Sequence, residues 1–380
     1  MEEQRVRAGA GPIPSAHLGF VDATKGLGIL AVIWGHMDYL WSTSSVWFSS
    51  FKLAVFFVVV GLLKARRYEA RGQEESCGVV WGKRLYSLVI PYGVYSLLAI
   101  LAHLAFAAVR HQGMLEALRG DIFLTITLRG IATLWFLPTL LLAELLFAAI
   151  RPESRSRAVK LLLCILMPVL LWAVCWFYEG MDLPEGLLAQ AGQNLFVVAA
   201  KSVSGCWFML CGYYIYRHLD PKRLSRPLIL VVLLAVNLGL SLLSPKLDFN
   251  SFRLGRFGLV FYVNGVLGSV ALLELLRYLE GRVSLRPLIW CGKNSMFLMA
   301  THLPWYIAPV LVAVGKRFYT AAAPDVKYFL VMLAEFAALM AIEFVMVWCK
   351  DKIKGTITGG GKENSPRSEE RRVGKECRSR

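Results

Sequence analysis

Three ionisable residues in one apolar stretch indicate the chemistry that this sequence could perform. Asp22, Lys25 and His36 all lie in DATKGLGILAVIWGH. His36 follows Lys25 by eleven positions, so a helix would place both on one face, about 16 Å apart, with Asp22 one turn before the lysine. Ionisable groups in a lipid-spanning helix are costly and normally face the protein or a wet cavity. A neutral imidazole can take a proton from a hydroxyl, which makes His36 the candidate base.

Other ionisable side chains also fall in predicted apolar segments: Glu144, Lys201, Glu274, His302, Glu335 and Glu343. Such groups are often structural pairs or reach the membrane interface. We expect Glu274 to pair with nearby Arg277. For Glu144 a structural and a functional role are both open, and for the lysine and the two last glutamates a structural role is favoured.

The second histidine ends the motif GKNSMFLMATH. His302 follows Asn294 by eight positions, and Asn294 and Ser295 stand at the start of a predicted helix. Both are good N-cap types, so capping is their simplest role. A helix N-terminus that faces the cytosol could also bind an anion.

Composition places these residues in a membrane protein. The chain has 380 residues, of which 57% are hydrophobic and 18% charged, and its net charge is +16. Apolar segments of about 20 residues recur along it, which is typical of a polytopic helical membrane protein. The basic residues lie in short loops between these segments, as positive-inside topology requires, so nucleic-acid binding is not expected.

The predicted fold is an all-α integral membrane bundle of about ten helices. The spans are Gly19–Trp41, Val46–Leu63, Leu85–Val109, Ile131–Ile150, Ala158–Phe177, Asn194–Tyr216, Leu228–Leu243, Phe257–Leu279, Ser295–Val314 and Tyr328–Cys349. Alternate loops are rich and poor in Lys and Arg, so we expect both termini in the cytosol.

The predicted spans divide the chain into three parts. Residues 1–18 are a cytosolic segment, 19–349 the transmembrane domain and 350–380 a disordered cytosolic tail. The final SEERRVGKECRSR resembles translated vector sequence and is left out of the fold prediction. The cysteines and histidines lack metal-ligand spacing, so neither a disulfide nor a bound metal is expected.

Five motifs occur in an order that resembles the membrane-bound acyltransferase family 3. They are DATKGLGILAVIWGH, FFVVVGLLKARR, WGKRLYSLVIPY, LWFLPTLLLAELLF and CGKNSMFLMATH, spread over most of residues 20–305. The most similar branch is fucose 4-O-acetylase-like, with a first helix that reads D-x-x-K-G and ends in G-H. The resemblance implies about ten helices and transfer of acyl groups, mostly acetyl, from cytosolic acyl-CoA to hydroxyls of extracytoplasmic acceptors such as surface carbohydrates.

The resemblance also suggests site residues. His36 stands at the histidine of the family's Arg-x10-His element, and Lys25 stands at its arginine. Lysine keeps the charge but loses the planar fork, so a bidentate phosphate clamp is not expected there. The candidate catalytic residues are His36, Lys25, Asp22, His302 and Glu144.

The expected donor site lies among basic residues of the cytosolic side. The family's Arg-x-x-Arg element is represented by Lys83 and Arg84, with Ser87 at its second position, and the Ser-Gly of its second helix is Val60-Gly61 here. A serine role at position 60 is therefore excluded. The residues expected to bind the acyl-CoA donor are Lys83, Arg84, Arg66, Arg67, Trp135, Asn294 and Ser295.

The sequence predicts an O-acyltransferase, an O-acetyltransferase in its simplest form, that is multi-pass in the bacterial plasma (inner) membrane. Its partners would be acyl-CoA (acetyl-CoA) as donor substrate, a cell-surface polysaccharide or lipid-linked sugar as acceptor, and the lipid bilayer. His36 would be a general base or a covalent acyl carrier. The alternative is a proton-coupled secondary transporter or exporter of a surface-glycan precursor, because charged helices suit a carrier too. A third interpretation, a membrane sensor domain like those fused to racemases, lacks its second catalytic domain here.

Overall fold

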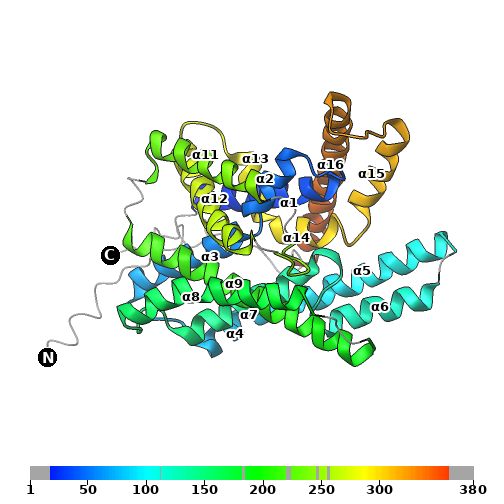
Figure 1. Cartoon of the computed structure of the whole chain (residues 1–380). Helices are drawn as coiled ribbons and strands as arrows, with labels where there is room; N and C mark the ends of the chain where they lie inside the picture. Colours follow the sequence, from blue (N-terminus) through cyan, green and yellow to red (C-terminus); the bar gives the residue numbers. More distant parts are fainter. Residues whose placement is uncertain are drawn as a thin grey trace, which may run out of the picture.

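The computed structural model describes residues 18–111, 113–181, 185–219, 224–244, 248–254 and 257–358. Helices joined by turns and loops make up these ranges, which confirms the predicted all-α class for this part of the chain (Figure 1). The helices are α1 (Gly19–Met37), α2 (Thr43–Phe51), α3 (Ala54–Arg71), α4 (Cys77–Arg84), α5 (Ile90–Val109), α6 (Met114–Ile126), α7 (Phe136–Ile150), α8 (Arg157–Glu179), α9 (Leu187–His218), α11 (Pro227–Leu243), α12 (Gly258–Leu279), α13 (Arg286–Lys293), α14 (Ser295–Thr301), α15 (Ile307–Phe318) and α16 (Val326–Thr358). A π-helical turn, η2 (Leu85–Val89), joins α4 to α5, and a 3₁₀ turn, η3 (Ala132–Trp135), precedes α7.

Seven helical segments of the described residues are long and apolar enough to cross a membrane: Thr43–Arg71, Cys77–Val109, Ala132–Ile150, Arg157–Glu179, Leu187–His218, Gly258–Leu279 and Val326–Thr356. The apolar helix Pro227–Leu243 is shorter. Large apolar side chains of α8, such as Leu162, Ile165 and Leu170, are exposed, as expected of side chains that contact lipid. These lengths support a multi-pass membrane protein, while the count of about ten spans and the cytosolic termini stay predictions.

Helix α1 lies inside the bundle, in contact with α2, α3, α12, α13, α14, α15 and α16 (Figure 1). Its closest neighbour is α13, and the two backbones meet at a pair of glycines. A Cβ added to Gly26 would lie 1.9 Å from the carbonyl oxygen of Leu288, and one added to Gly292 would lie 1.8 Å from that of Asp22. Only glycine permits such an approach between helices, so these two residues set the position of α1.

Helices α3 and α9 cross in the same way. A Cβ on Gly61 would lie 2.1 Å from the carbonyl oxygen of Met209, and one on Gly212 would lie 2.3 Å from that of Val58. Position 61 is the glycine of the motif FFVVVGLLKARR, so its role in the structure is close helix packing.

The predicted span Ser295–Val314 is wrong as a single helix. The chain ends α14 at Thr301, turns through residues 302–306 and begins α15 at Ile307. Tyr306, directly before α15, has a φ of +59°, in the left-handed region. The turn begins at His302, directly after the end of α14. Non-helical backbone of this kind is tolerated at membrane depth where it is buried in protein.

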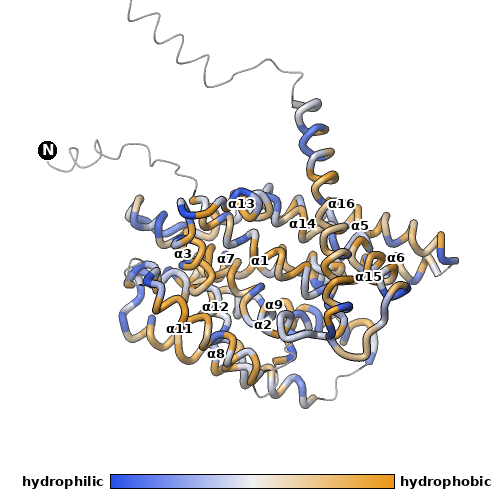
Figure 2. The backbone as a smooth tube through the Cα atoms, turned by 90° about the horizontal axis from the view of Figure 1, so that it is seen from above, coloured by the Kyte–Doolittle hydropathy of each residue, from blue (hydrophilic) through white to orange (hydrophobic). Residues whose placement is uncertain are grey.

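The boundary predicted at Cys349 is also wrong. Helix α16 continues to Thr358, so residues 350–358 are helical where a disordered tail is expected. The end of α16 projects beyond the bundle and is more hydrophilic than the rest of the helix (Figure 2). Residues 1–17 and 359–380, to which the other terminal predictions apply, lie outside the described residues.

Helices α5 and α6 run side by side and extend away from the bundle (Figure 1). The short apolar stretch Ile122–Leu128 lies at the end of α6, which has only 13 residues. Near this end Tyr92 of α5 donates to the carbonyl oxygen of Thr125 at 2.9 Å, which fastens the two helices together.

Candidate active site

The two histidines singled out in the sequence lie next to each other. His36 is in the last turn of α1 and His302 directly follows α14, and their ring centroids are 5.4 Å apart. Each histidine lies at the C-terminal end of its helix, α1 or α14. The structure therefore brings together two imidazoles from distant parts of the chain.

His302 is fully buried, and its ring has a defined orientation. Its Nδ1 lies 2.6 Å from the carbonyl oxygen of Leu298 one turn earlier. A carbonyl only accepts hydrogen bonds, so Nδ1 carries the proton and Nε2 of the neutral ring keeps a lone pair. Among the described residues Nε2 has no hydrogen-bond partner, so it can accept one from a bound molecule.

His36, by contrast, is exposed to solvent, although it also interacts electrostatically with His302 and Lys52. The backbone after it is fixed by Asp38, whose carboxylate accepts hydrogen bonds from the backbone N–H and hydroxyl of Ser42 and from the hydroxyls of Ser45 and Tyr328. Four hydrogen bonds to one carboxylate favour its ionised form. An accessible histidine at a fixed helix end suits a reacting group.

Lys52 approaches His36 from the junction of α2 and α3. A Cβ added to Gly35 would lie 2.5 Å from Nζ of Lys52, so glycine at position 35 makes room for the ammonium group beside the histidine. Asp38 and Asp248 both act on Lys52 through their charges. The histidine pair thus has a cation at its open side.

The two charges at the other end of α1 neutralise each other. Nζ of Lys25 lies 2.6 Å from Oδ1 of Asp22, whose side chain is buried. This is one of the two arrangements expected for the pair, the other being contact between Lys25 and the donor. Asp22 and Lys25 lie at the opposite end of α1 from His36, so the catalytic roles predicted for Asp22 and Lys25 stay predictions.

Glu144 lies in a buried ion-pair cluster with residues of α3 and α4. Its carboxylate is 3.1 Å from Nζ of Lys64 and 2.7 Å from Nη2 of Arg84, and its side chain is only 1% exposed. These contacts tie α7 to α3 and α4. They give Glu144 a structural role, and its predicted catalytic role is supported by none of its described contacts.

Glu75, in the turn between α3 and α4, extends this network. It forms ion pairs with Lys64 at 3.5 Å and Arg67 at 3.7 Å, and a shorter one with Lys83. Burial would raise the pKa of Glu75, but the hydrogen bond from Lys83 and the charges of Lys64 and Arg67 lower it. We call these six side chains, Lys64, Arg67, Lys83, Arg84, Glu75 and Glu144, the Glu144 cluster.

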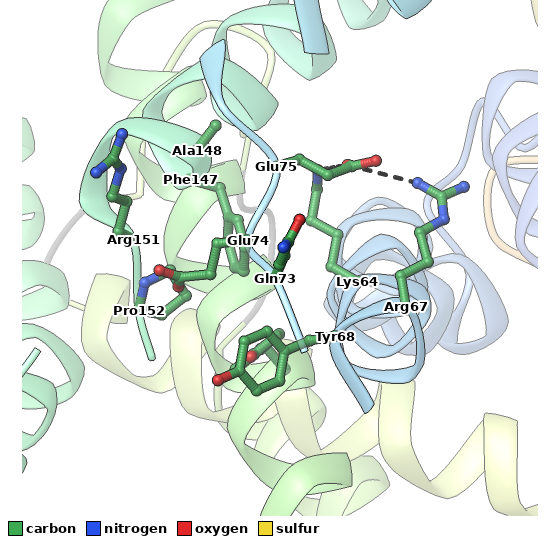
Figure 3. Close-up of a pocket in the computed structure, with 11 residues that line it drawn as sticks. Lys64, Arg67, Tyr68, Gln73, Glu74, Glu75, Phe147, Ala148, Arg151 and Pro152 are labelled. Atoms are coloured by element: carbon green, nitrogen blue, oxygen red, sulfur yellow. Dashed lines mark ion pairs between the residues drawn. The ribbon is translucent and has the colours of Figure 1, made fainter. Parts of the chain in front are cut away.

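A small hollow opens beside this cluster (Figure 3). Lys64 and Arg67 lie on one side of the hollow, and dashed lines mark their ion pairs with Glu75. Arg151 lies on the opposite side. Phe147 and Tyr213 supply apolar walls. The lining thus combines basic and acidic side chains, Glu74 among the latter, with aromatic ones.

The other predicted donor residues are scattered. Arg66 is exposed on α3, on the same helical turn as Arg67. Trp135 is buried beneath Lys201, whose Nζ lies 3.9 Å from a ring centroid. It also contacts Phe249, 6.0 Å away between centroids, so none of its described contacts joins it to the Glu144 cluster.

Asn294 lies between α13 and α14, and Ser295 is the first residue of α14, but the Asn294 side chain does not cap α14 as expected. Its amide donates to the carbonyl oxygen of Trp290 at 3.0 Å, and its Oδ1 accepts from Lys350 of α16 at 3.0 Å. Asn294 therefore joins α13 to α16. A donor-binding role for Asn294 and Ser295 stays a prediction.

A second polar cluster, which the sequence does not reveal, lies near the histidines. Lys201 and Arg129 both donate to Oδ1 of Asn250, at 3.2 Å and 2.6 Å, and Asp248 acts on both cations. With Lys52 these residues form what we call the Lys201 cluster: Lys52, Arg129, Lys201, Asp248 and Asn250. Lys52 stands in the apolar stretch SSFKLAVFF, and a charged residue in such a stretch is the sequence feature that could have indicated this cluster.

A family model described as an acyltransferase domain matches residues 18–348. The chain belongs to the acyltransferase 3 family. The match covers both histidines and both clusters. No curated protein and no solved structure matches the chain.

Membership of the acyltransferase 3 family indicates the kind of reaction in which the two histidines could take part. The family implies an acyltransferase in a membrane, which agrees with the apolar helices of this chain. Acyl transfer needs a group that accepts a proton from the attacking nucleophile. In this acyltransferase 3 protein the accessible His36 and the oriented His302 are candidates for that step.

Proposed function

We propose that this acyltransferase 3 protein transfers an acetyl group from cytosolic acetyl-CoA to a hydroxyl of a cell-envelope carbohydrate. The observation that carries the proposal is the contact of His36 with His302, because two imidazoles 5.4 Å apart at two helix ends provide proton acceptors for an attacking hydroxyl. The proposed location is the bacterial plasma membrane.

In the proposed reaction His36 removes the hydroxyl proton as the oxygen attacks the thioester carbonyl. The new C–O ester bond forms, the C–S bond of the thioester breaks, and the proton held by His36 passes to the departing thiolate, which leaves as CoA. His302 accepts a hydrogen bond at Nε2 from a neighbouring hydroxyl of the carbohydrate and so orients the acceptor. Its own orientation is held by the bond from Nδ1 to Leu298. A covalent acyl-histidine is the alternative for the same pair.

The donor would bind from the side of the Glu144 cluster. Arg67 and Arg151 border the hollow and Arg66 is exposed beside Arg67, so these three arginines suit the phosphates of CoA, Arg67 through the part of its guanidinium that the 3.7 Å ion pair with Glu75 leaves open. Lys83 and Arg84 are already engaged with Glu75 and Glu144. Their proposed part is to hold the walls of the hollow, in addition to the charge they contribute.

The proposal is tested in cells that lack the gene and are complemented with wild-type or His36→Ala protein. The O-acetyl content of the surface polysaccharide is measured by mass spectrometry, and the amount of protein in the membrane by immunoblot. We expect wild type to restore acetylation and His36→Ala to restore none at equal protein level. Acetylation that persists in the variant would overturn the assignment.

An assay without the acyl donor distinguishes the alternative function, a transporter, from the proposed acyltransferase. Proteoliposomes that lack any acyl-CoA should not move an unmodified sugar across the bilayer. Uptake under these conditions, driven by a pH gradient, would favour the carrier.

A further inference from the structure

The Lys201 cluster carries more positive than negative charge. Lys201 is fully buried on α9, Arg129 is half-buried before η3, and both donate to the same oxygen of Asn250. No carboxylate of the described residues lies within 4.0 Å of the cationic nitrogens of Lys52, Arg129 or Lys201. Asp248, which acts on all three, is exposed to solvent.

This arrangement leaves the buried ammonium group of Lys201 poorly compensated. Removing an ion from water is costly. A desolvated cation is stabilised in part above an aromatic ring and by a hydrogen bond to an amide oxygen. The face of Trp135 and Oδ1 of Asn250 therefore offset part of the cost, and a bound anion would offset the rest.

The cluster lies beside the reacting histidines by two separate routes. Lys201 sits on Trp135, and Thr133 of the same turn donates to the carbonyl oxygen of Met299 at 2.6 Å, in the helix that ends at His302. Lys52 lies against Gly35, next to His36. A molecule whose anionic group meets the cluster can thus present another part to the histidines.

We propose that the acceptor is an anionic carbohydrate, whose carboxylate or phosphate is bound by Lys201 and Arg129 while its hydroxyl meets His36. Carboxylates and phosphates share this chemistry, since both accept several bonds from ammonium and guanidinium groups. The proposal rests on the proposed function and adds the class of acceptor to it.

The test measures binding rather than turnover, so that it stands apart from the acetyl-transfer assay. Full-length protein in nanodiscs is titrated by calorimetry with methyl β-D-glucuronide, glucose 1-phosphate and methyl β-D-glucoside. We expect at least one anionic probe to bind tenfold or more tightly than the neutral glucoside. The tighter of the two shows whether a carboxylate or a phosphate is the natural group. Equal binding of all three, or no binding of either anion, would overturn the proposal.

Three variants assign the anion preference to the cluster. Lys201→Met removes the buried charge with little change of shape, and Arg129→Gln tests the half-buried partner if the first variant fails to fold. Both should lose tenfold or more in affinity for the anionic probe and less than twofold for the glucoside. Lys316→Met is the matched control, because Lys316 also lies over an aromatic ring, 4.0 Å from the centroid of Tyr39, but outside the cluster. Unchanged anion binding in both cluster variants would contradict the assignment.

Failure of this proposal and failure of the proposed function are distinguishable. Acetyl transfer that depends on His36, with no preference for anions, would overturn the acceptor class alone. Anion binding that depends on Lys201, in a protein that does not change surface acetylation, would overturn the proposed function.

Discussion

Two basic clusters of this protein differ in how their charge is balanced. In the Glu144 cluster, the four cations contact two carboxylates at ion-pair distance. In the Lys201 cluster, two cations share the amide oxygen of Asn250. Paired charges join helices, whereas cations with no described carboxylate within ion-pair distance can bind a ligand. The difference indicates that the first cluster is mainly structural, with its ligand at the rim, and that the second is a binding site.

The largest effect is expected from breaking a pair in the Glu144 cluster. Arg84→Ala leaves the buried Glu144 with Lys64 alone. Removing one partner of a buried pair typically costs about 3–5 kcal/mol of unfolding free energy. Thermal unfolding in nanodiscs measures the loss. The double variant with Glu144→Gln should recover most of it, and an unchanged unfolding temperature for Arg84→Ala would show that the cluster is not structural.

The next effect concerns the packing of α1, which carries His36, against α13. Gly292→Ala places a Cβ 1.8 Å from the carbonyl oxygen of Asp22, so α1 and α13 must move apart. Overpacking of this kind costs about 1–3 kcal/mol. We expect a lower unfolding temperature and reduced acetyl transfer, because α1 carries His36. Gly82→Ala, where a Cβ meets nothing within 4 Å, is the matched control and should leave both quantities unchanged.

A smaller effect is expected at the rim of the hollow. The double variant Arg67→Ala, Arg151→Ala should raise the KM for acetyl-CoA about tenfold, which corresponds to about 1.4 kcal/mol, with little change in kcat. Initial rates at varied donor concentration give both constants. A KM equal to that of Lys316→Ala, used as a surface control, would remove the donor site from this hollow.

The smallest effect concerns pH. The folded-state pKa of Glu75 lies below the ordinary value of 4.5, so its stabilising contribution is fully present above pH 4.5 and is lost as pH falls through the folded-state value. Glu75→Gln should therefore lower the unfolding temperature by an equal small amount at pH 8 and pH 5. The difference should shrink below pH 4.5. A difference that vanished already between pH 8 and pH 5 would contradict this sign.

Local pattern was sufficient to predict much of the fold. The apolar segments predict helices where the structure has them, and the spacing of Glu274 and Arg277 predicts their ion pair, observed at 3.3 Å. The turn at 302–306 was missed because an apolar sequence does not reveal where a buried helix ends. The continuation of α16 was missed because polar composition alone does not distinguish a solvated helix from a coil.

The candidate site was only partly accessible from sequence. His36 and His302 stand out as histidines in apolar helices, but their contact depends on the packing of α1 and α14. In the structure Glu144 forms ion pairs with Lys64 and Arg84, and Lys201 donates a hydrogen bond to Asn250. No spacing along the chain encodes such partners, since they come from helices that are distant in sequence.

The most direct test of the central claim is acetyl transfer by purified protein in proteoliposomes. Acetyl-CoA labelled in the acetyl group is supplied on the side of the Glu144 cluster, envelope glycan on the opposite side, and the label in the glycan is counted for wild type and His36→Gln. The account predicts labelled glycan and an equal amount of released CoA with wild type, and neither above background with His36→Gln. Equal labelling by the two proteins would contradict it.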